Sequence, residues 1–175
     1  MACALTSGRA LPCKSSVGGL KTVYFADYGT LGAATIVAGE ITVLGGTPEW
    51  FQFDIKGSSS LETTVNSSRE NGTTFYEQTL NLTLTYLDKA TQEEIKLLAA
   101  GRPHVAIEDY NGNFFLVGLE HGAEVTGGTI ASGAAMGDLS GFTLTFAAQE
   151  TAPAYFVTSS VITGDASATQ INPTA

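Results

Sequence analysis

The stretch that decides the fold is residues 73–103, which read TTFYEQTLNLTLTYLDKATQEEIKLLAAGRP. Between Phe75 and Leu87, leucine and tyrosine alternate with threonine and asparagine. This period of two predicts a strand with one apolar face and one face rich in hydroxyl groups. The predicted strand is long, since strands usually have about five or six residues.

The second half of the stretch predicts an amphipathic helix at about 89–100. Asp88 is a good N-cap, and Ile95 and Leu98 recur at the spacing of a buried helical stripe. Gly101 stands where a left-handed residue commonly ends a helix, and a proline follows two residues later. A two-faced strand that leads directly into one short helix indicates a sheet covered by a single helix. We therefore expect a mainly β fold, an antiparallel β-sandwich or barrel with one flanking α-helix.

The rest of the chain must supply the other strands. We expect an extended N-terminal arm at 1–19, a β domain at 20–157 and a loose C-terminal tail at 158–175. In the expected strand at 49–56, one face holds Phe51, Phe53 and Ile55, and the other holds Trp50, Gln52, Asp54 and Lys56. The other expected strands include 20–28, 35–37, 41–44, 61–66 and 141–147. The predicted core consists of Leu80, Leu82, Leu84, Ile95, Leu98, Ile107, Leu116, Phe142, Leu144 and Phe146.

A hairpin is expected after the helix, because Asn111-Gly112 is the preferred pair for a two-residue type I′ turn. Such a turn pairs Ile107 with Leu116 and Val105 with Gly118, and places these four residues on one face.

Composition limits the function classes. The 175 residues carry a net charge of −9 with only eight basic residues, whereas a free-standing nucleic-acid binder is normally basic. No apolar run approaches the roughly 20 residues of a membrane span, so we expect no membrane association. The two cysteines, Cys3 and Cys13, do not form a metal-binding or disulfide framework and are expected to be reduced.

The two histidines are the remaining candidates for chemistry. His121 lies between Glu120 and Glu124, and a histidine beside carboxylates can act as a metal ligand or general base. Neither His121 nor His104 has a partner at a fixed spacing, so hydrogen-bonded or surface imidazoles are the favoured interpretation. No phosphate-binding loop or nucleophile elbow is present. We expect no catalytic site, no metal and no cofactor, hence no enzyme.

Six segments resemble major tail tube proteins of tailed phages. They are 8–14 (GRALPCK), 77–84 (EQTLNLTL), 93–103 (EEIKLLAAGRP), 111–118 (NGNFFLVG), 122–129 (GAEVTGGT) and 136–146 (MGDLSGFTLTF). The resemblance covers roughly residues 1–157, and the first segment is similar to the start of such proteins from phages of Bacteroidetes-type hosts. The resemblance implies six-fold rings that stack into a hollow tube, an architecture shared with type VI secretion tubes. One sheet of each subunit then lines the channel.

The resemblance also implies partners and a location. The chain is expected to associate with itself and with other tail proteins, such as the tape measure, terminator, baseplate or sheath. DNA passes through the lumen without specific binding. The protein would be made in the host cytoplasm and end in the virion. Two alternatives stay open: another virion or injection-machine protein of similar fold (tail terminator, head completion or capsid decoration), and a stand-alone ligand-binding β-sandwich.

Two surfaces follow from this resemblance. The candidates for the lumen are Glu62, Thr64, Glu77, Thr79 and Asn81, since each lies opposite the apolar face of its strand. The candidate contact between stacked rings is an expected loop with no large apolar residue: Asn66, Ser67, Ser68, Arg69, Glu70, Asn71, Gly72, Thr73 and Thr74.

Overall fold

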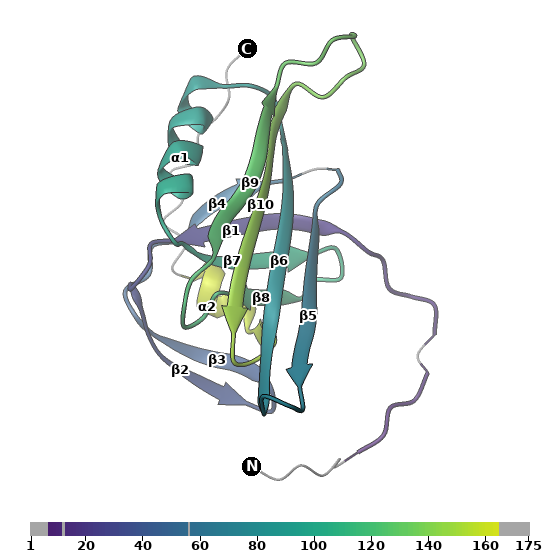
Figure 1. The fold of residues 1–175 in the computed structure, drawn as a ribbon, viewed down its shortest axis with the longest axis vertical. Helices are drawn as coiled ribbons and strands as arrows, with labels where there is room; N and C mark the ends of the chain where they lie inside the picture. Colours follow the sequence, from purple (N-terminus) through teal and green to yellow (C-terminus); the bar gives the residue numbers. More distant parts are fainter. Residues whose placement is uncertain (1–6, 12, 56, 165–175) are drawn as a thin grey trace.

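The computed structural model describes residues 7–11, 13–55 and 57–164, which form two β-sheets and two helices (Figure 1). The elements are, in chain order, β1 (Leu20–Ala26), β2 (Leu31–Val37), β3 (Glu40–Gly46), β4 (Phe51–Asp54), β5 (Ser60–Ser68), β6 (Thr73–Thr85), α1 (Lys89–Ala100), β7 (His104–Asp109), β8 (Phe114–Val117), β9 (Glu124–Ala131), β10 (Gly141–Glu150), β11 (Tyr155–Val157) and α2 (Ser159–Thr163). The expected mainly β sandwich with a flanking helix is confirmed.

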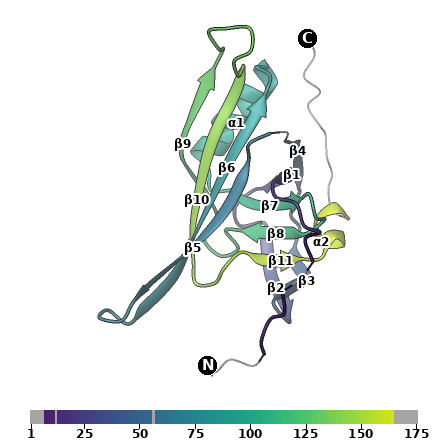
Figure 2. The same cartoon turned by 90° about the vertical axis from the view of Figure 1, so that its right-hand side faces the viewer.

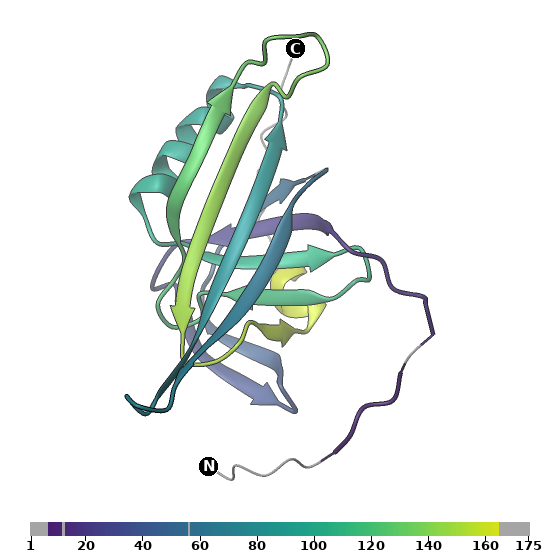
Figure 3. The same ribbon diagram turned by 45° about the vertical axis from the view of Figure 1, so that its right-hand side comes forward.

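The two sheets pack face to face with their strands crossing steeply (Figure 3). The seven-stranded sheet has the order β2-β3-β11-β8-β7-β1-β4, and the four-stranded sheet has the order β5-β6-β10-β9. All strand pairs are antiparallel except that between β11 and β3. The four-stranded sheet carries the long strand β6 at its centre, paired with β5 on one side and β10 on the other.

The first hydrophobic cluster fills the space between the sheets. Leucines 80, 82 and 84 of β6 pack there with Phe142, Leu144 and Phe146, which pair with them across the ladder. Ile95 and Leu98 of α1 join the same cluster. Of the ten predicted core residues, nine are buried and Leu98 is partly buried. The predicted inward face of β6 is therefore confirmed.

A second cluster lies on the other side of the seven-stranded sheet. It contains Tyr24, Ile41, Trp50, Leu116 and Ile162, among others, beneath the β2–β3 hairpin and α2. Trp50 lies on the face opposite Phe53 and Ile55, as predicted, but this face is covered by the second cluster and the side chain is fully buried. The central strands of this sheet are thus buried on both faces, and a simple inside–outside alternation does not apply to them.

Helix α1 has the predicted bounds and the predicted cap. The Asp88 carboxylate accepts hydrogen bonds from the backbone N–H groups of Ala90 (3.0 Å) and Thr91 (3.2 Å). The prediction for Gly101 was wrong, because its φ of −105° is not left-handed. Its N–H closes the last turn on the carbonyls of Leu97 and Leu98, and the chain leaves in an extended conformation that leads straight into β7.

The β7–β8 hairpin has a register one residue away from the predicted one. Ile107 pairs with Phe115, and Val105 pairs with Val117. The Asp109 carboxylate accepts hydrogen bonds from the backbone N–H groups of Asn111 and Asn113, both at 2.8 Å, and this widens the turn by one residue. Because a slip of one residue reverses a strand's faces, Ile107 lies in the first cluster and Leu116 in the second.

The two ends of the described chain differ. The described part of the N-terminal arm before β1 has no strand or helix, is exposed, and extends away from the sheets (Figure 1). Asn111 holds its last part by bonding both the N–H (2.9 Å) and the carbonyl (2.7 Å) of Val17. At the other end, the expected loose tail begins with helix α2, whose Ile162 is buried. Cys13 is exposed on the arm, while Cys3 lies outside the described residues.

Candidate functional site

The outward side of the four-stranded sheet is the widest regular surface that carries candidate site residues. We call it the polar face. Its members, assigned from the strand registers, include Ser60, Glu62, Thr64 and Asn66 of β5; Glu77, Thr79, Asn81 and Thr83 of β6; Thr143, Thr145 and Ala147 of β10; and Glu124, Gly127 and Thr129 of β9.

The structure brings the five lumen candidates together on this face. Glu62 pairs with Thr79, and Thr64 pairs with Glu77. Asn81 follows two residues after Thr79 on the same side of β6. The five side chains therefore form one continuous patch over β5 and β6, opposite the residues that pack in the core.

Hydrogen bonds between side chains link neighbouring strands of the polar face. The hydroxyls of Thr129 and Thr143 lie 2.6 Å apart, and the Thr145 hydroxyl donates to Asn81 Oδ1 at 3.0 Å. Asn66 donates from Nδ2 to the Glu77 carboxylate at 3.4 Å. These bonds use part of the hydrogen-bonding capacity of the polar side chains within the sheet, so fewer donors and acceptors remain to bind another molecule.

The charge on this surface has one sign. Glu62, Glu77 and Glu124 are its carboxylates, and the four described strands that form the sheet contain no lysine or arginine. A phosphate group near this face meets hydroxyls and carboxylates rather than cations. Since neutralisation of phosphates by lysine and arginine supplies most of the affinity for DNA, the polar face is unsuited to bind it.

The expected loop at 66–74 is mostly strand, so that part of the prediction was wrong. β5 continues to Ser68 and β6 begins at Thr73, and only residues 69–72 form the turn. The Ser67 and Thr74 hydroxyls lie 3.1 Å apart across the ladder, and Gly72 has a φ of +63°. Serine and threonine pair well across strands, so a polar stretch without large side chains still extends the hairpin.

This hairpin extends beyond the body of the protein (Figure 2). Its turn carries Arg69 and Glu70, both exposed. Just before and after the polar stretch lie Val65 and Phe75, which are 59% and 39% exposed. A neighbouring subunit could bury these apolar side chains as well as contact the polar residues of the turn.

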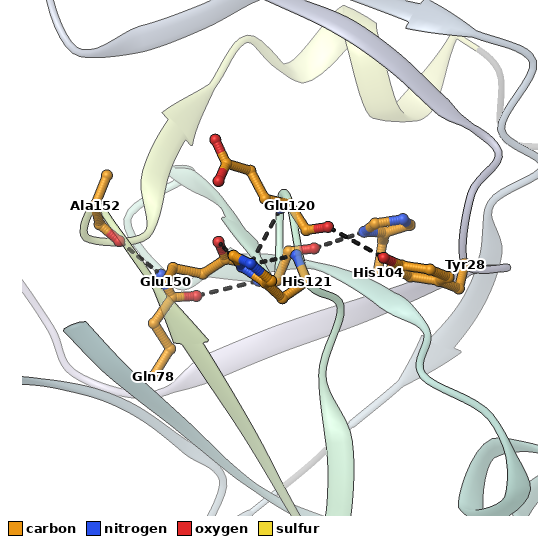
Figure 4. Close-up of polar contacts among 8 residues, drawn as sticks. Tyr28, Gln78, His104, Glu120, His121, Glu150 and Ala152 are labelled. Carbon is orange, nitrogen blue, oxygen red and sulfur yellow. Dashed lines mark hydrogen bonds and ion pairs between the residues drawn. The ribbon is translucent and has the colours of Figure 1, made fainter. Parts of the chain in front are cut away.

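His104 is part of the fold rather than of an open site (Figure 4). Its Nδ1 bonds the Gly118 carbonyl, and its Nε2 accepts the N–H of Gly29 at 3.3 Å. Tyr28 stacks on its ring at 5.2 Å between centroids. Burial lowers the pKa of His104, because the charged imidazolium is poorly solvated there.

His121 meets a carboxylate that the sequence pattern did not indicate. Its Nδ1 lies 3.0 Å from Glu150 at the end of β10, while Glu124 belongs to the polar face. Glu150 also accepts the backbone N–H groups of Glu120 and His121. The pairing joins residues 29 positions apart, and no local motif signals it.

Gln78 was also missed. It lies on the inward side of β6 and is buried, and it accepts the N–H of Gly118 while donating to the carbonyl of Ala152, both at 3.1 Å. In the sequence, Gln78 stands two residues before Leu80 and so shares the inward face of the leucines, and this position was the signal of a buried polar contact.

Comparisons with protein-family models, with curated proteins and with solved structures found no match. Among the described residues, none of the helices has both the length and the apolar character that crossing a bilayer requires.

Proposed function

We propose that this chain is a structural, non-catalytic subunit of a phage tail tube. Six copies form a ring, rings stack into a hollow conduit, and the polar face lines the lumen through which the genome and ejected proteins pass. The observation that carries the proposal is the polar face itself. It is a broad antiparallel surface of hydroxyls and carboxylates, without cations in its four described strands, on the back of a core-packed sheet.

The chemistry of this face suits a conduit for DNA. A lumen must let phosphate pass without holding it, and a cationic wall would do the opposite. The polar face offers three carboxylates per subunit, and these would repel phosphate at close range. Its threonines and asparagine are partly satisfied by one another, which limits their hydrogen bonding to bases or to passing proteins.

The edges of the four-stranded sheet support ring closure. β5 and β9 are its two outer strands and have no further strand beside them in the described chain. Exposed edges readily pair with another chain. Pairing of β5 in one subunit with β9 in the next would extend one polar surface from subunit to subunit and leave no free edge in a closed ring.

The β5–β6 hairpin is the proposed contact between stacked rings. It extends past the body of the subunit and presents Val65, Phe75 and the Arg69-Glu70 turn (Figure 2). A neighbouring ring that covered the two apolar side chains would gain their burial, at roughly 25 cal/mol for each Å² removed from water. Tape measure, terminator, baseplate or sheath proteins are the further partners, and the virion is the proposed location.

Electron microscopy of the purified protein, combined with analytical ultracentrifugation, tests this function. We expect rings or tubes of constant diameter that hold six subunits per ring. Isolated rings that never stack would favour a terminator or another completion protein. A monomer at all concentrations and salt conditions would contradict the proposal.

A further inference from the structure

Three side chains with metal-binding atoms meet at the junction of the two sheets. Glu120 and His121 come from the turn between β8 and β9, and Glu150 comes from the end of β10. The nearest ligand atoms of the three residues all lie within 4.8 Å of one another. None of these residues belongs to the polar face or to the β5–β6 hairpin.

The buried member of this cluster is held in place by the backbone. Glu150 is only 5% exposed, and its Oε1 accepts the N–H groups of Glu120 at 3.0 Å and His121 at 2.8 Å (Figure 4). Its Oε2 faces His121 Nδ1 at 3.0 Å. The two backbone bonds fix the orientation of the carboxylate, as hydrogen bonds around metal ligands commonly do.

The other two members are open to solvent. The His121 side chain is 60% exposed, and Glu120 beside it is also exposed. An ion can therefore enter, and Glu120 can change rotamer at small cost. The turn that carries both residues is anchored independently, because Gln78 binds the Gly118 N–H and His104 binds the Gly118 carbonyl.

We propose that Glu120, His121 and Glu150 form a binding site for a divalent transition-metal ion, with Zn²⁺ as the best fit. Bonds of about 2.0–2.1 Å to nitrogen and oxygen in a tetrahedral site place neighbouring ligands roughly 3.3 Å apart. The separation of His121 Nδ1 and Glu150 Oε2, 3.0 Å, needs to grow only slightly. One imidazole and two carboxylates suit Zn²⁺, whereas Mg²⁺ and Ca²⁺ prefer oxygen ligands alone.

The bound ion has a structural consequence. It joins the β8–β9 turn to the end of β10, where the chain passes from the four-stranded sheet to β11 of the seven-stranded sheet. The ion would thus stabilise the contact between the sheets within one subunit. This inference does not rest on the proposed tail tube function, since it concerns the subunit before assembly.

The test is a Zn²⁺ titration of the full chain by isothermal calorimetry, after treatment with EDTA and dialysis. Cys3→Ser and Cys13→Ser are present in every sample, because thiolates bind Zn²⁺ themselves. We expect one Zn²⁺ per chain, with no comparable binding of Mg²⁺ or Ca²⁺. His121→Ala and Glu120→Gln should each weaken binding at least about tenfold. Glu124→Gln, a nearby carboxylate outside the cluster, is the matched control and should bind as the parent does.

Thermal unfolding provides a second readout. At a Zn²⁺ concentration about 100 times Kd, the midpoint of the parent should rise by roughly 5–10 °C, and that of His121→Ala should not move. The unliganded midpoints show whether each variant is folded. Zn²⁺ binding that is equal in parent, His121→Ala and Glu120→Gln would overturn the proposal, as would no binding by the parent at millimolar Zn²⁺.

Discussion

The sharpest prediction concerns the β5–β6 hairpin. Replacing residues 67–74 by Asn-Gly places the new turn between Asn66 and Phe75, which already face each other across the ladder. The two-residue Asn-Gly turn suits a hairpin closed at this pair. We expect the shortened subunit to fold and to lose the ability to stack rings into tubes.

The cost to the fold can be worked from the contacts that are removed. The segment holds two cross-strand pairs, Ser67 with Thr74 and Ser68 with Thr73. It also holds two hydroxyl contacts, 3.1 Å between Ser67 and Thr74 and 3.3 Å from the Asn71 N–H to the Ser68 hydroxyl. Exposed pairs of this kind contribute about 0.2–1 kcal/mol each, and a shorter loop offsets part of the loss. No residue of the segment belongs to either hydrophobic cluster. The free energy of unfolding should therefore fall by about 1–2 kcal/mol at most.

Two measurements decide the outcome. Urea denaturation gives the change in stability, and electron microscopy with sedimentation shows whether tubes form. The double variant Arg69→Ser, Glu70→Ser keeps the hairpin's length and removes only the charges of its turn, so it separates the contribution of these charges to stacking from that of the extension. Tubes of normal length from the shortened protein would refute the stacking role. A fall in the free energy of unfolding well above about 2 kcal/mol would show that the removed segment contributes more to the fold than its cross-strand pairs.

Three further predictions follow from the core, the polar face and the buried histidine. Leu82→Ala should lower the free energy of unfolding by about 2–5 kcal/mol in urea denaturation, while Leu97→Ala on the exposed side of α1 should cost well under that amount; a similar loss for both would contradict the assigned core. The double variant Glu62→Lys, Glu77→Lys should leave the subunit folded but make assembled tubes retain DNA in a salt-dependent way. The rate of DNA release measures this effect, and an unchanged rate at low salt would count against a luminal position. Burial lowers the pKa of His104, so the unfolded chain takes up a proton on this imidazole more readily than the folded chain does. The free energy of unfolding should therefore fall as the pH drops below about 6.5, by at most about 1.4 kcal/mol per pH unit. His104→Gln should flatten this part of the pH profile in chemical denaturation, and an unchanged profile would contradict the assignment.

Local signals predicted the centre of the fold. The alternation in β6 and the cap at Asp88 act through neighbouring residues, so the bounds and inward faces of β6 and α1 could be predicted within a residue or two. The β7–β8 register failed for an equally local reason. The side chain of Asp109 captures the amides of Asn111 and Asn113, and this bond set outweighs the usual preference of Asn-Gly for a two-residue turn.

The rest depended on contacts distant in sequence. Alternation placed Trp50 on the correct face, but one strand cannot reveal that a second cluster covers this face of its sheet. The continuous apolar run Val23-Tyr24-Phe25 was the available signal in the sequence, since strands covered on both faces lose their alternation. The sequence pointed to His121 beside Glu120 as a possible metal ligand, but the meeting of His121 with Glu150 has no counterpart in the local sequence, so the third member of the cluster became visible only in the structure.

The burial pattern also bears on which surface could face a lumen. The central strands of the seven-stranded sheet are covered on both sides, so they offer no broad open face. The four-stranded sheet has such a face, and its carboxylates number three per subunit, hence eighteen in a ring of six. Charges separated by more than a Debye length, about 8–10 Å at physiological salt, are largely screened. Carboxylates on opposite walls of a wide channel would therefore hardly repel each other, while a phosphate passing close to one wall would still be repelled. A sparse set of carboxylates among neutral hydroxyls can thus keep DNA from binding without opposing the closure of the ring.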